Sequence, residues 1–152
     1  MLIKTKCFGE VDIAEDKIIT FDGGLFGFEE YKKYTVLYDV ECKEESISWL
    51  QSIDEPTLAL PVVSPLLVKP DYNPIVEDTL LEPLGTVSDE NIAIFFVMTV
   101  PSDLTLMSVN LKAPLLINAD SKKGIQIIVE NQDYPVKYMV HDLFTVNNRG
   151  GN

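Results

Sequence analysis

The stretch Leu104–Val129, LTLMSVNLKAPLLINADSKKGIQIIV, decides the fold of this chain. Its β-branched and aliphatic runs are bounded by Asn, Asp, Ser and Gly, a pattern typical of short strands joined by turns. The predicted strands begin at Leu104, Ala113 and Ile125. Asn110 and Asn118 border these runs, so we expect their side-chain amides to hold turns. No residue pattern in the stretch indicates catalysis.

Similar runs along the rest of the chain predict a mainly β protein. The further predicted strands cover Leu2–Phe8, Val11–Phe21 with a charged interruption, Tyr34–Val40, Ile47–Ile53, Thr57–Val63 and Ile92–Val100. The last of these is nearly all apolar, so we expect it to be buried on both faces. Tyr134–Val140 fits either a final strand or a short helix. About ten short strands and few helical signals favour a closed or nearly closed antiparallel β-barrel with one or two short helices.

Three shorter features modify this pattern. Gly9-Glu10 predicts a turn, and the charged segment Glu29–Lys33 predicts a single helical turn. Pro61 lies inside a predicted strand, which indicates an edge strand or a bulge because proline cannot donate a ladder hydrogen bond.

Pro65–Pro83 contains four prolines, so we expect much of it to be extended and partly exposed. Glu77–Leu84 predicts a short helix that Pro83 ends or follows, and Gly85 is a plausible stop. The side chains expected to pack against the protein from this helix are Leu80, Leu81 and Leu84.

The length of 152 residues predicts one domain, which we place at residues 1–146, followed by a flexible tail at 147–152. The first residues, MLIKTKCFGE, lack the apolar core of a signal peptide. The longest apolar run, Ile92–Val100, is too short to cross a bilayer. We therefore expect a cytoplasmic protein with no membrane contact.

The charge balance bears on the kind of partner. There are 24 acidic and 12 basic residues, for a formal charge of -12. Phosphate and anionic lipid surfaces both attract basic patches, so the balance disfavours direct binding to nucleic acid or membrane. It favours a basic protein partner, because opposite fields raise the rate of encounter.

The acidic residues are concentrated in one part of the chain. No Lys or Arg occurs between Lys69 and Lys112. The acids within this interval are Asp71, Glu77, Asp78, Glu82, Asp89, Glu90 and Asp103. Two interpretations remain open: a solvated face that aids solubility, or a landing surface for a basic protein. A second acidic cluster spans Asp39–Glu55.

Phe21–Glu29, FDGGLFGFE, is a glycine-rich loop that carries three phenylalanines. Glycine allows sharp bends, and the aromatic side chains have two possible uses. They can plug one end of the core, or they can form a hydrophobic docking loop. The loop lacks the Lys-Ser/Thr of a phosphate-binding loop.

Few residues suggest chemistry. His141 lies beside Asp142, but adjacent residues are not poised as base and orienter on a strand or a helix. Cys7 and Cys42 have no ligand spacing and are expected to behave as small apolar residues. We therefore predict no catalytic residue, no metal site and no cofactor.

Several motifs together resemble the bacterial flagellar assembly factor FliW family. The most specific is N-L-x-A-P followed by three aliphatic residues and Asn, which matches NLKAPLLIN. The matching segments, in family order, are Phe21–Glu29, Trp49–Ser52, Pro70–Tyr72, Asn110–Asn118, and Gly124 with Gln126.

The resemblance implies a function without catalysis. Proteins of this family bind flagellin in the cytoplasm and also bind CsrA, a translational repressor that is an RNA-binding dimer. When flagellin is exported, the freed factor takes up the repressor, which releases flagellin mRNA. We expect the acidic segment, Asp71–Glu90, to face the repressor. We expect an apolar patch near Phe26, Phe28 and Tyr72 to hold a helical terminal segment of flagellin. The candidate partner-binding residues are Asp71, Tyr72, Glu77, Asp78, Glu82, Phe26 and Phe28.

Two other classes of function compete with this interpretation. A small β-barrel enzyme or ligand carrier would need a deep pocket with converging polar groups. A structural subunit would need a large self-complementary interface. The sequence contains no repeated apolar face of the kind that indicates an obligate oligomer. We therefore expect the free protein to be a monomer.

Overall fold

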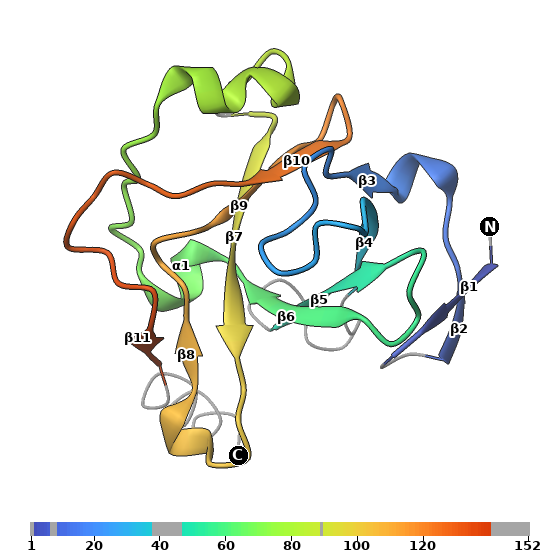
Figure 1. Ribbon diagram of the computed structural model, residues 1–152, viewed down its shortest axis with the longest axis horizontal. Coiled ribbons are helices and arrows are strands. Elements are labelled where there is room, and N and C mark those ends of the chain that lie inside the picture. Colours follow the sequence, from blue (N-terminus) through green and yellow to red (C-terminus); the bar gives the residue numbers. More distant parts are fainter. Residues whose placement is uncertain (1, 7–8, 38–46, 89, 141–152) are drawn as a thin grey trace.

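The computed structural model describes residues 2–6, 9–37, 47–88 and 90–140. Within them, seven strands form a closed barrel in the order β7-β6-β5-β4-β3-β10-β9, and β9 pairs back onto β7 (Figure 1). These strands are β3 (Ile19–Thr20), β4 (Lys33–Leu37), β5 (Ser48–Ser52), β6 (Ala59–Val63), β7 (Ile92–Thr99), β9 (Leu115–Asn118) and β10 (Lys123–Gln126). The prediction of a mainly β, closed barrel is confirmed.

The barrel ladders are antiparallel with one exception among the described pairings. β10 and β3 run parallel and pair through Lys123 and Thr20. Outside the barrel, β1 (Leu2–Thr5) and β2 (Gly9–Asp12) form a separate hairpin. β8 (Ser108–Val109) and β11 (Tyr138–Met139) extend the sheet beyond β7, so Tyr134–Val140 contains a strand rather than a helix.

The stretch Leu104–Val129 forms two of its three predicted strands as expected. β9 and β10 pair as a hairpin, although β10 begins at Lys123 and not at Ile125. The first predicted strand is mostly wrong, because Leu104–Leu106 forms the 3-10 helix η4 and only β8 follows it. The Asp103 carboxylate accepts hydrogen bonds from the N–H (3.1 Å) and hydroxyl (2.6 Å) of Thr105, which stabilises a local turn in place of a strand.

The two asparagines of this stretch hold turns, as predicted. The Asn110 side-chain oxygen accepts from the N–H groups of Lys112 and Ala113, each at 3.0 Å. The Asn118 side-chain oxygen accepts from the N–H groups of Asp120 (2.8 Å) and Ser121 (3.2 Å). Each side-chain oxygen therefore accepts hydrogen bonds from backbone N–H groups that have no backbone partner within the turn.

The prediction that Pro61 marks an edge strand or a bulge is wrong. β6 lies between β5 and β7, and Pro61 pairs in regular register with Trp49. The proline is tolerated because the ladder from β6 to β7 joins Val62 and Val63 and stops short of Pro61. The missing N–H therefore lies beyond the end of that ladder.

Two predicted local elements are also wrong. Gly9-Glu10 is not a turn but the start of β2, where Gly9 (φ 66°) pairs with Thr5. Glu29–Lys33 contains no helical turn, because Glu29 accepts a hydrogen bond from the Gly27 N–H (3.0 Å) and stabilises a loop turn instead. Predictions on residues 7–8, 38–46 and 141–152 lie outside the described residues.

The protein has two apolar clusters on opposite sides of the barrel wall. The first is the barrel interior: Ile19, Phe21, Leu25, Tyr34, Leu50, Val62, Leu115 and Ile117. The second lies between the outer wall and the segments that cover it; its largest members are Leu84, Phe96, Met98, Leu111, Leu116 and Tyr134. We call these the barrel interior and the outer layer. Alternate residues of β7 enter the two clusters, since Phe95 and Val97 pack inside and Phe96 and Met98 outside.

β7 is less buried than predicted. Phe96 and Met98 are buried, but Phe95 and Val97 are only partly covered, and Ala93 and Thr99 are exposed. The expectation that both faces are buried is therefore wrong for the side that carries Phe95 and Val97.

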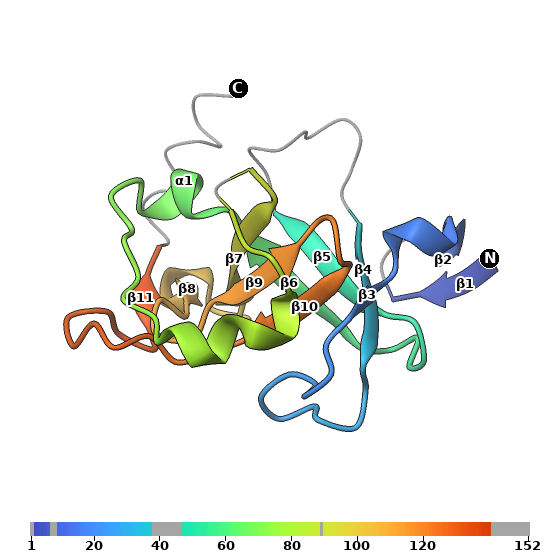
Figure 2. The same ribbon diagram turned by 90° about the horizontal axis from the view of Figure 1, so that it is seen from above.

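The predicted helix at residues 77–84 is present as the 3-10 helix η3 (Asp78–Leu84), and Gly85 ends it with a φ of 79°. Figure 2 shows η3 lying outside the barrel, beside β10. Leu84 is fully buried and Leu81 packs on the outer layer, whereas Leu80 is 41% exposed, so its predicted packing is wrong. Pro83 lies inside the helix and not at its end. A short α-helix, α1 (Pro65–Val68), precedes this segment and was not predicted.

Candidate functional site

The loop Phe21–Lys32 covers one end of the barrel, and its three phenylalanines differ in burial. Phe21 is fully buried, and its ring lies edge-on to Tyr34 at 5.5 Å between centroids. Phe26 is 49% exposed and Phe28 is half-buried. Gly24 (φ 69°) makes the bend possible, because a Cβ there would lie 2.5 Å from the Cα of Glu29.

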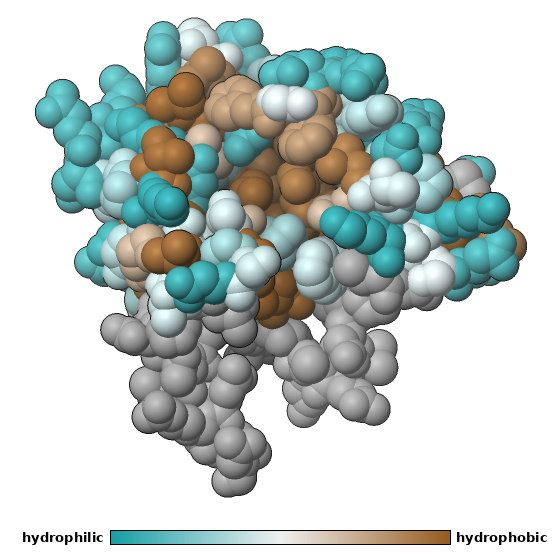
Figure 3. Space-filling view, turned by 60° about the horizontal axis from the view of Figure 1, so that its bottom comes forward, coloured by the Kyte–Doolittle hydropathy of each residue, from teal (hydrophilic) through white to brown (hydrophobic). Residues whose placement is uncertain are grey.

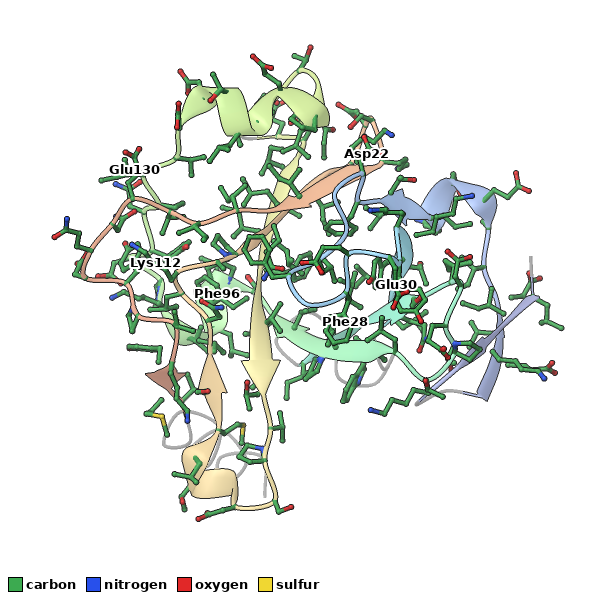
Figure 4. All side chains as sticks on the ribbon, in the orientation of Figure 1. Asp22, Phe28, Glu30, Phe96, Lys112 and Glu130 are labelled. Carbon is green, nitrogen blue, oxygen red and sulfur yellow. The ribbon has the colours of Figure 1, made fainter. Side chains whose placement is uncertain are left out.

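The loop borders an apolar hollow at this end of the barrel, which we call the loop mouth. Figure 3 shows apolar side chains gathered in a hollow in the middle of one face. Its partly buried members pack on the barrel interior and are Phe28, Tyr31, Leu58, Leu60, Phe95 and Val97. Figure 4 shows Phe28 and Glu30 on the same loop in front of the barrel. The loop mouth thus offers aromatic and aliphatic groups beside a carboxylate.

A side chain from the barrel wall fixes the position of Phe26. The Gln126 side-chain oxygen accepts a hydrogen bond from the Phe26 N–H (2.9 Å), and its amide nitrogen donates to the Ala113 carbonyl (3.1 Å). Gln126 belongs to β10, so the exposed ring projects from a backbone anchored to the sheet. Sequence reasoning noted Gln126 only as part of a family motif.

The acidic segment follows α1 and crosses the outer layer. Its exposed carboxylates include Glu77, Asp78 and Glu82. Asp71 is also exposed but pairs with Lys69 at 3.1 Å, and this hydrogen bond and charge lower the pKa of the Asp71 carboxyl. The charge of Asp71 is therefore partly neutralised, whereas η3 carries carboxylates in an interval without Lys or Arg.

Tyr72 lies in the outer layer and not with the phenylalanines of the loop mouth. Its ring stacks on Tyr134 at 4.7 Å and lies edge-on to Phe96 at 4.6 Å. Its hydroxyl donates to the Leu111 carbonyl at 2.7 Å. Burial raises the pKa of Tyr72, and the neighbouring Tyr134 adds to the shift. The structure thus separates Tyr72, which packs on the outer layer, from Phe28, which packs on the barrel interior, and Phe26 belongs to neither cluster.

A set of hydrogen bonds joins the acidic segment to the loop at residues 130–134, and we call it the Asn131 clamp. The Asn131 side chain accepts from the Ile75 N–H (2.6 Å) and donates to the Asn73 carbonyl (3.0 Å). Backbone and hydroxyl bonds flank it, from the Glu130 N–H to the Ile75 carbonyl (2.8 Å) and from the Asn73 N–H to the Tyr134 hydroxyl (2.8 Å). The clamp holds the chain just before the exposed carboxylates of η3.

Lys112 completes the clamp by donating from its ammonium to the Asn131 carbonyl at 2.6 Å. Figure 4 shows Lys112 and Glu130 on the same side of the molecule as Phe96. Sequence reasoning missed Asn131, since it lies in a polar run that indicates only a turn. Its turn-forming residue type was the one available signal.

Other chemistry has little support in the described part of the chain. No group of three or more His, Cys, Asp or Glu side chains is placed to hold a metal ion within those residues. His141, Asp142, Cys7 and Cys42 lie outside them. Of the helices that the structure describes, none has the length and apolar character needed to cross a bilayer.

These features define a closed seven-stranded β-barrel protein with an apolar mouth and an acidic outer segment. The FliW protein family model matches residues 2–140. "Flagellar assembly factor FliW" of Lachnospira eligens is 54% identical over 146 residues, covering 94% of this chain and 96% of that protein. The protein of the same name from Lachnoclostridium phytofermentans is 55% identical over 145 residues, covering 95% and 93%. The chain therefore belongs to the FliW family.

A solved structure supports the same assignment at the level of the fold. The crystal structure of the flagellar assembly factor FliW superposes with a TM-score of 0.82 at 30% identity. The match covers 92% of this chain and 96% of that one. The barrel and its outer layer are thus shared along nearly the whole length of both chains.

Proposed function

We propose that this protein is a non-enzymatic flagellar assembly factor that works in the cytoplasm by binding flagellin and the repressor CsrA in turn. The observation that carries the proposal is the family match over residues 2–140, together with relatives named flagellar assembly factor. The partners follow from the family resemblance. Release of flagellin leaves the factor able to take up the repressor, which frees flagellin mRNA for translation.

Flagellin docks, in this proposal, at the loop mouth. Phe26 is exposed and anchored through its own N–H, and Phe28 lines the adjacent hollow. An amphipathic helical segment can place apolar side chains in such a hollow. Exposed aromatic anchors at the centre of an interface often carry most of the binding energy.

The test is Phe26→Ala in a binding titration with purified flagellin. We expect the affinity to fall by about tenfold or more, because one anchor is lost, while the melting temperature stays nearly unchanged. Val136→Ala is the matched control, since Val136 is 66% exposed and lies outside the loop mouth. Unchanged flagellin affinity in Phe26→Ala would place the flagellin site elsewhere.

The repressor docks, in this proposal, on the acidic segment, with η3 at its centre. Glu77, Asp78 and Glu82 are exposed, and the Asn131 clamp holds the chain that leads to them. Negative charge attracts a basic protein and repels RNA phosphate from the same surface. Such attraction weakens as salt screens it over a Debye length of roughly 8 Å at physiological ionic strength.

Charge reversal of Glu77, Asp78 and Glu82 to Lys tests this site. We expect association with CsrA to slow by about tenfold at low salt and the dependence on salt to flatten. A control with the same change in net charge reverses the exposed residues Glu10, Glu15 and Asp133. Equal effects of the two triple variants would show that association with CsrA depends on net charge alone and would contradict a site on η3.

Exchange between partners is tested by co-purification with flagellin and CsrA, first separately and then together. Added flagellin is expected to displace CsrA in proportion to its concentration. Light scattering of the protein alone is expected to give the mass of a monomer. A stable ternary complex with unchanged affinities would contradict the exchange.

A further inference from the structure

A groove lies at the opposite end of β3 and β4 from the loop mouth. It is an open groove of about 410 Å³, and we call it the lysine groove. Its apolar floor includes Ile19, Val36 and Ile117, and its charged rim consists of Asp16, Lys17 and Lys122. The loop that borders the loop mouth connects the end of β3 to the start of β4. The groove is lined instead by Lys17, which precedes β3, and by Leu37 at the end of β4. The two sites are therefore separate.

The charge of the groove is opposite to that of the molecule. Lys17, Lys122 and Asp16 are among its lining residues, and the Lys122 ammonium donates to the carbonyl of Ala119, which also lines it, at 2.6 Å, while the whole chain carries a formal charge of -12. A basic partner attracted by the rest of the surface would meet two lysines here. An apolar floor between cations suits a ligand that carries negative charge beside aliphatic groups.

The backbone of Lys122 is unusual and is held in place by its neighbours. Among the described residues, Lys122 is the one non-glycine residue with a positive φ, at 59°. Its N–H donates to the Asn118 carbonyl (3.0 Å), and its own carbonyl accepts from the Thr20 N–H (2.9 Å). Glycine would adopt this conformation at lower cost, and such outliers gather at functional sites. Lys122 thus occupies a position whose backbone conformation favours glycine.

Asn118 builds the turn that presents Lys122. Its side-chain oxygen accepts from two N–H groups of the turn, and its amide nitrogen donates to the carbonyls of Leu84 (2.8 Å) and Thr86 (2.9 Å). Asn118 is 1% exposed, so the rim of the groove stands on a buried and fully engaged side chain. The wall of the groove is thus rigid where the cation is placed.

We propose that the lysine groove binds a short acidic peptide segment of a protein partner, with aliphatic side chains between its carboxylates. The carboxylates pair with Lys17 and Lys122, and an aliphatic side chain covers Ile19 and Ile117. Asp16 favours a peptide over a simple fatty acid, because a backbone N–H can donate to its carboxylate and a fatty acid has no donor. This site does not depend on the flagellin and repressor sites proposed above.

The experiment uses the full chain and the peptide acetyl-Glu-Leu-Asp-Ile-Glu-amide as a probe. Titration followed by amide resonances should shift Thr20, Ala119 and Lys122, with an affinity that falls as salt is added. The analogue with Gln and Asn in place of the acids should bind about tenfold more weakly, as expected when charge-assisted hydrogen bonds are lost. Equal affinity of the two peptides would overturn the proposal.

Lys122→Gly separates binding from stability. Because glycine accepts a positive φ, the variant should melt at a higher temperature while it binds the acidic peptide about tenfold more weakly. Lys17→Gln should also weaken binding, and Lys137→Gln, at an exposed lysine outside the groove, should leave it unchanged. A higher melting temperature with unchanged peptide affinity would make Lys122 a structural feature only and would overturn the site.

Two other occupants are distinguished in the same titrations. If decanoate shifts the groove resonances and the peptide does not, the site takes a small amphiphile and the proposal is wrong. If the same resonances shift with protein concentration alone and the peptide fails to reverse this, the groove is a contact between two copies of the chain, which also contradicts it.

Discussion

The barrel interior and the outer layer differ in what holds them together. The barrel is closed by backbone ladders between neighbouring strands, and apolar side chains fill its interior. The outer layer packs irregular chain on the same wall through α1, η3 and the segment between them. Besides the short ladder between β8 and β11, side-chain hydrogen bonds and stacked tyrosines hold it there. The barrel is thus held mainly by backbone pairing and apolar packing, whereas the position of the acidic segment depends on a few specific side chains.

The strongest test of this contrast compares two phenylalanines of one loop. Phe21→Ala removes a fully buried ring from the barrel interior and should cost about 4 kcal/mol of unfolding free energy. Phe26→Ala truncates a ring that is 49% exposed and should change stability by no more than about 0.5 kcal/mol. Urea denaturation measures both. Similar losses of unfolding free energy in the two variants would mean that both rings, and not Phe21 alone, stabilise the barrel.

A comparison of the wild type with Tyr34→Phe at alkaline pH tests the barrel interior, because the buried Tyr72 phenol of the outer layer is common to both proteins. Burial, followed by the nearby Tyr31 and Asp54, raises the pKa of Tyr34 to about 12. Its phenol ionises near pH 10 in the unfolded chain, so the stability it contributes is present below about pH 10 and is lost as pH rises toward 12. Between pH 9 and pH 12 the wild type should lose on the order of 2 kcal/mol more than Tyr34→Phe. Parallel losses in the two proteins would contradict a raised pKa at Tyr34.

Removal of one hydroxyl from each region should have opposite effects. The Tyr72 hydroxyl donates to the Leu111 carbonyl, so Tyr72→Phe should cost about 1 kcal/mol. The Tyr34 hydroxyl is buried and has no hydrogen-bond partner among the described residues, so Tyr34→Phe should keep or raise stability at neutral pH. Thermal melts of the two variants measure the difference. A larger loss at Tyr34 than at Tyr72 would reverse the comparison.

A smaller loss of global stability than that of Tyr72→Phe is expected at the Asn131 clamp. Asn131→Ala removes two hydrogen bonds of a partly exposed side chain and should cost about 0.5–1 kcal/mol. Local amide exchange should report it better, because the Ile75 N–H loses its acceptor. Asn131→Asp is the matched variant, since it keeps that acceptor and removes only the bond to Asn73. Unchanged exchange at Ile75 in Asn131→Ala would show that backbone contacts alone hold the acidic segment.

The barrel was more predictable than the layer that covers it. Alternating and apolar runs predicted β5, β6, β7 and β9 because strand periodicity is a local property of the chain. Pro61 misled the prediction because its tolerance depends on where the ladder to β7 ends. Leu104–Leu106 misled it because a neighbouring carboxylate stabilised a turn. Both outcomes depend on partners that the local pattern does not specify.

The candidate site divides in the same way. The sequence was enough to single out the acidic segment and the phenylalanine-rich loop, since charge and residue type are visible in it. It grouped Tyr72 with Phe26 and Phe28, whereas in the structure Tyr72 packs on the outer layer, Phe28 packs on the barrel interior and Phe26 is exposed. The structure adds three residues whose contacts reach far along the chain. They are Asn131, Gln126 and Lys122, the last of which has a positive φ.

The sequence by itself determined the strand pattern, the family, the excess of negative charge and the asparagine turns, because each depends on residue type and short spacing. The tertiary structure alone decided which side of the wall each apolar residue packs on. It also decided which carboxylates stay unpaired and where two lysines meet across an apolar floor. Closing a barrel brings distant residues together through long-range pairing, such as β9 on β7, and no local preference specifies that geometry.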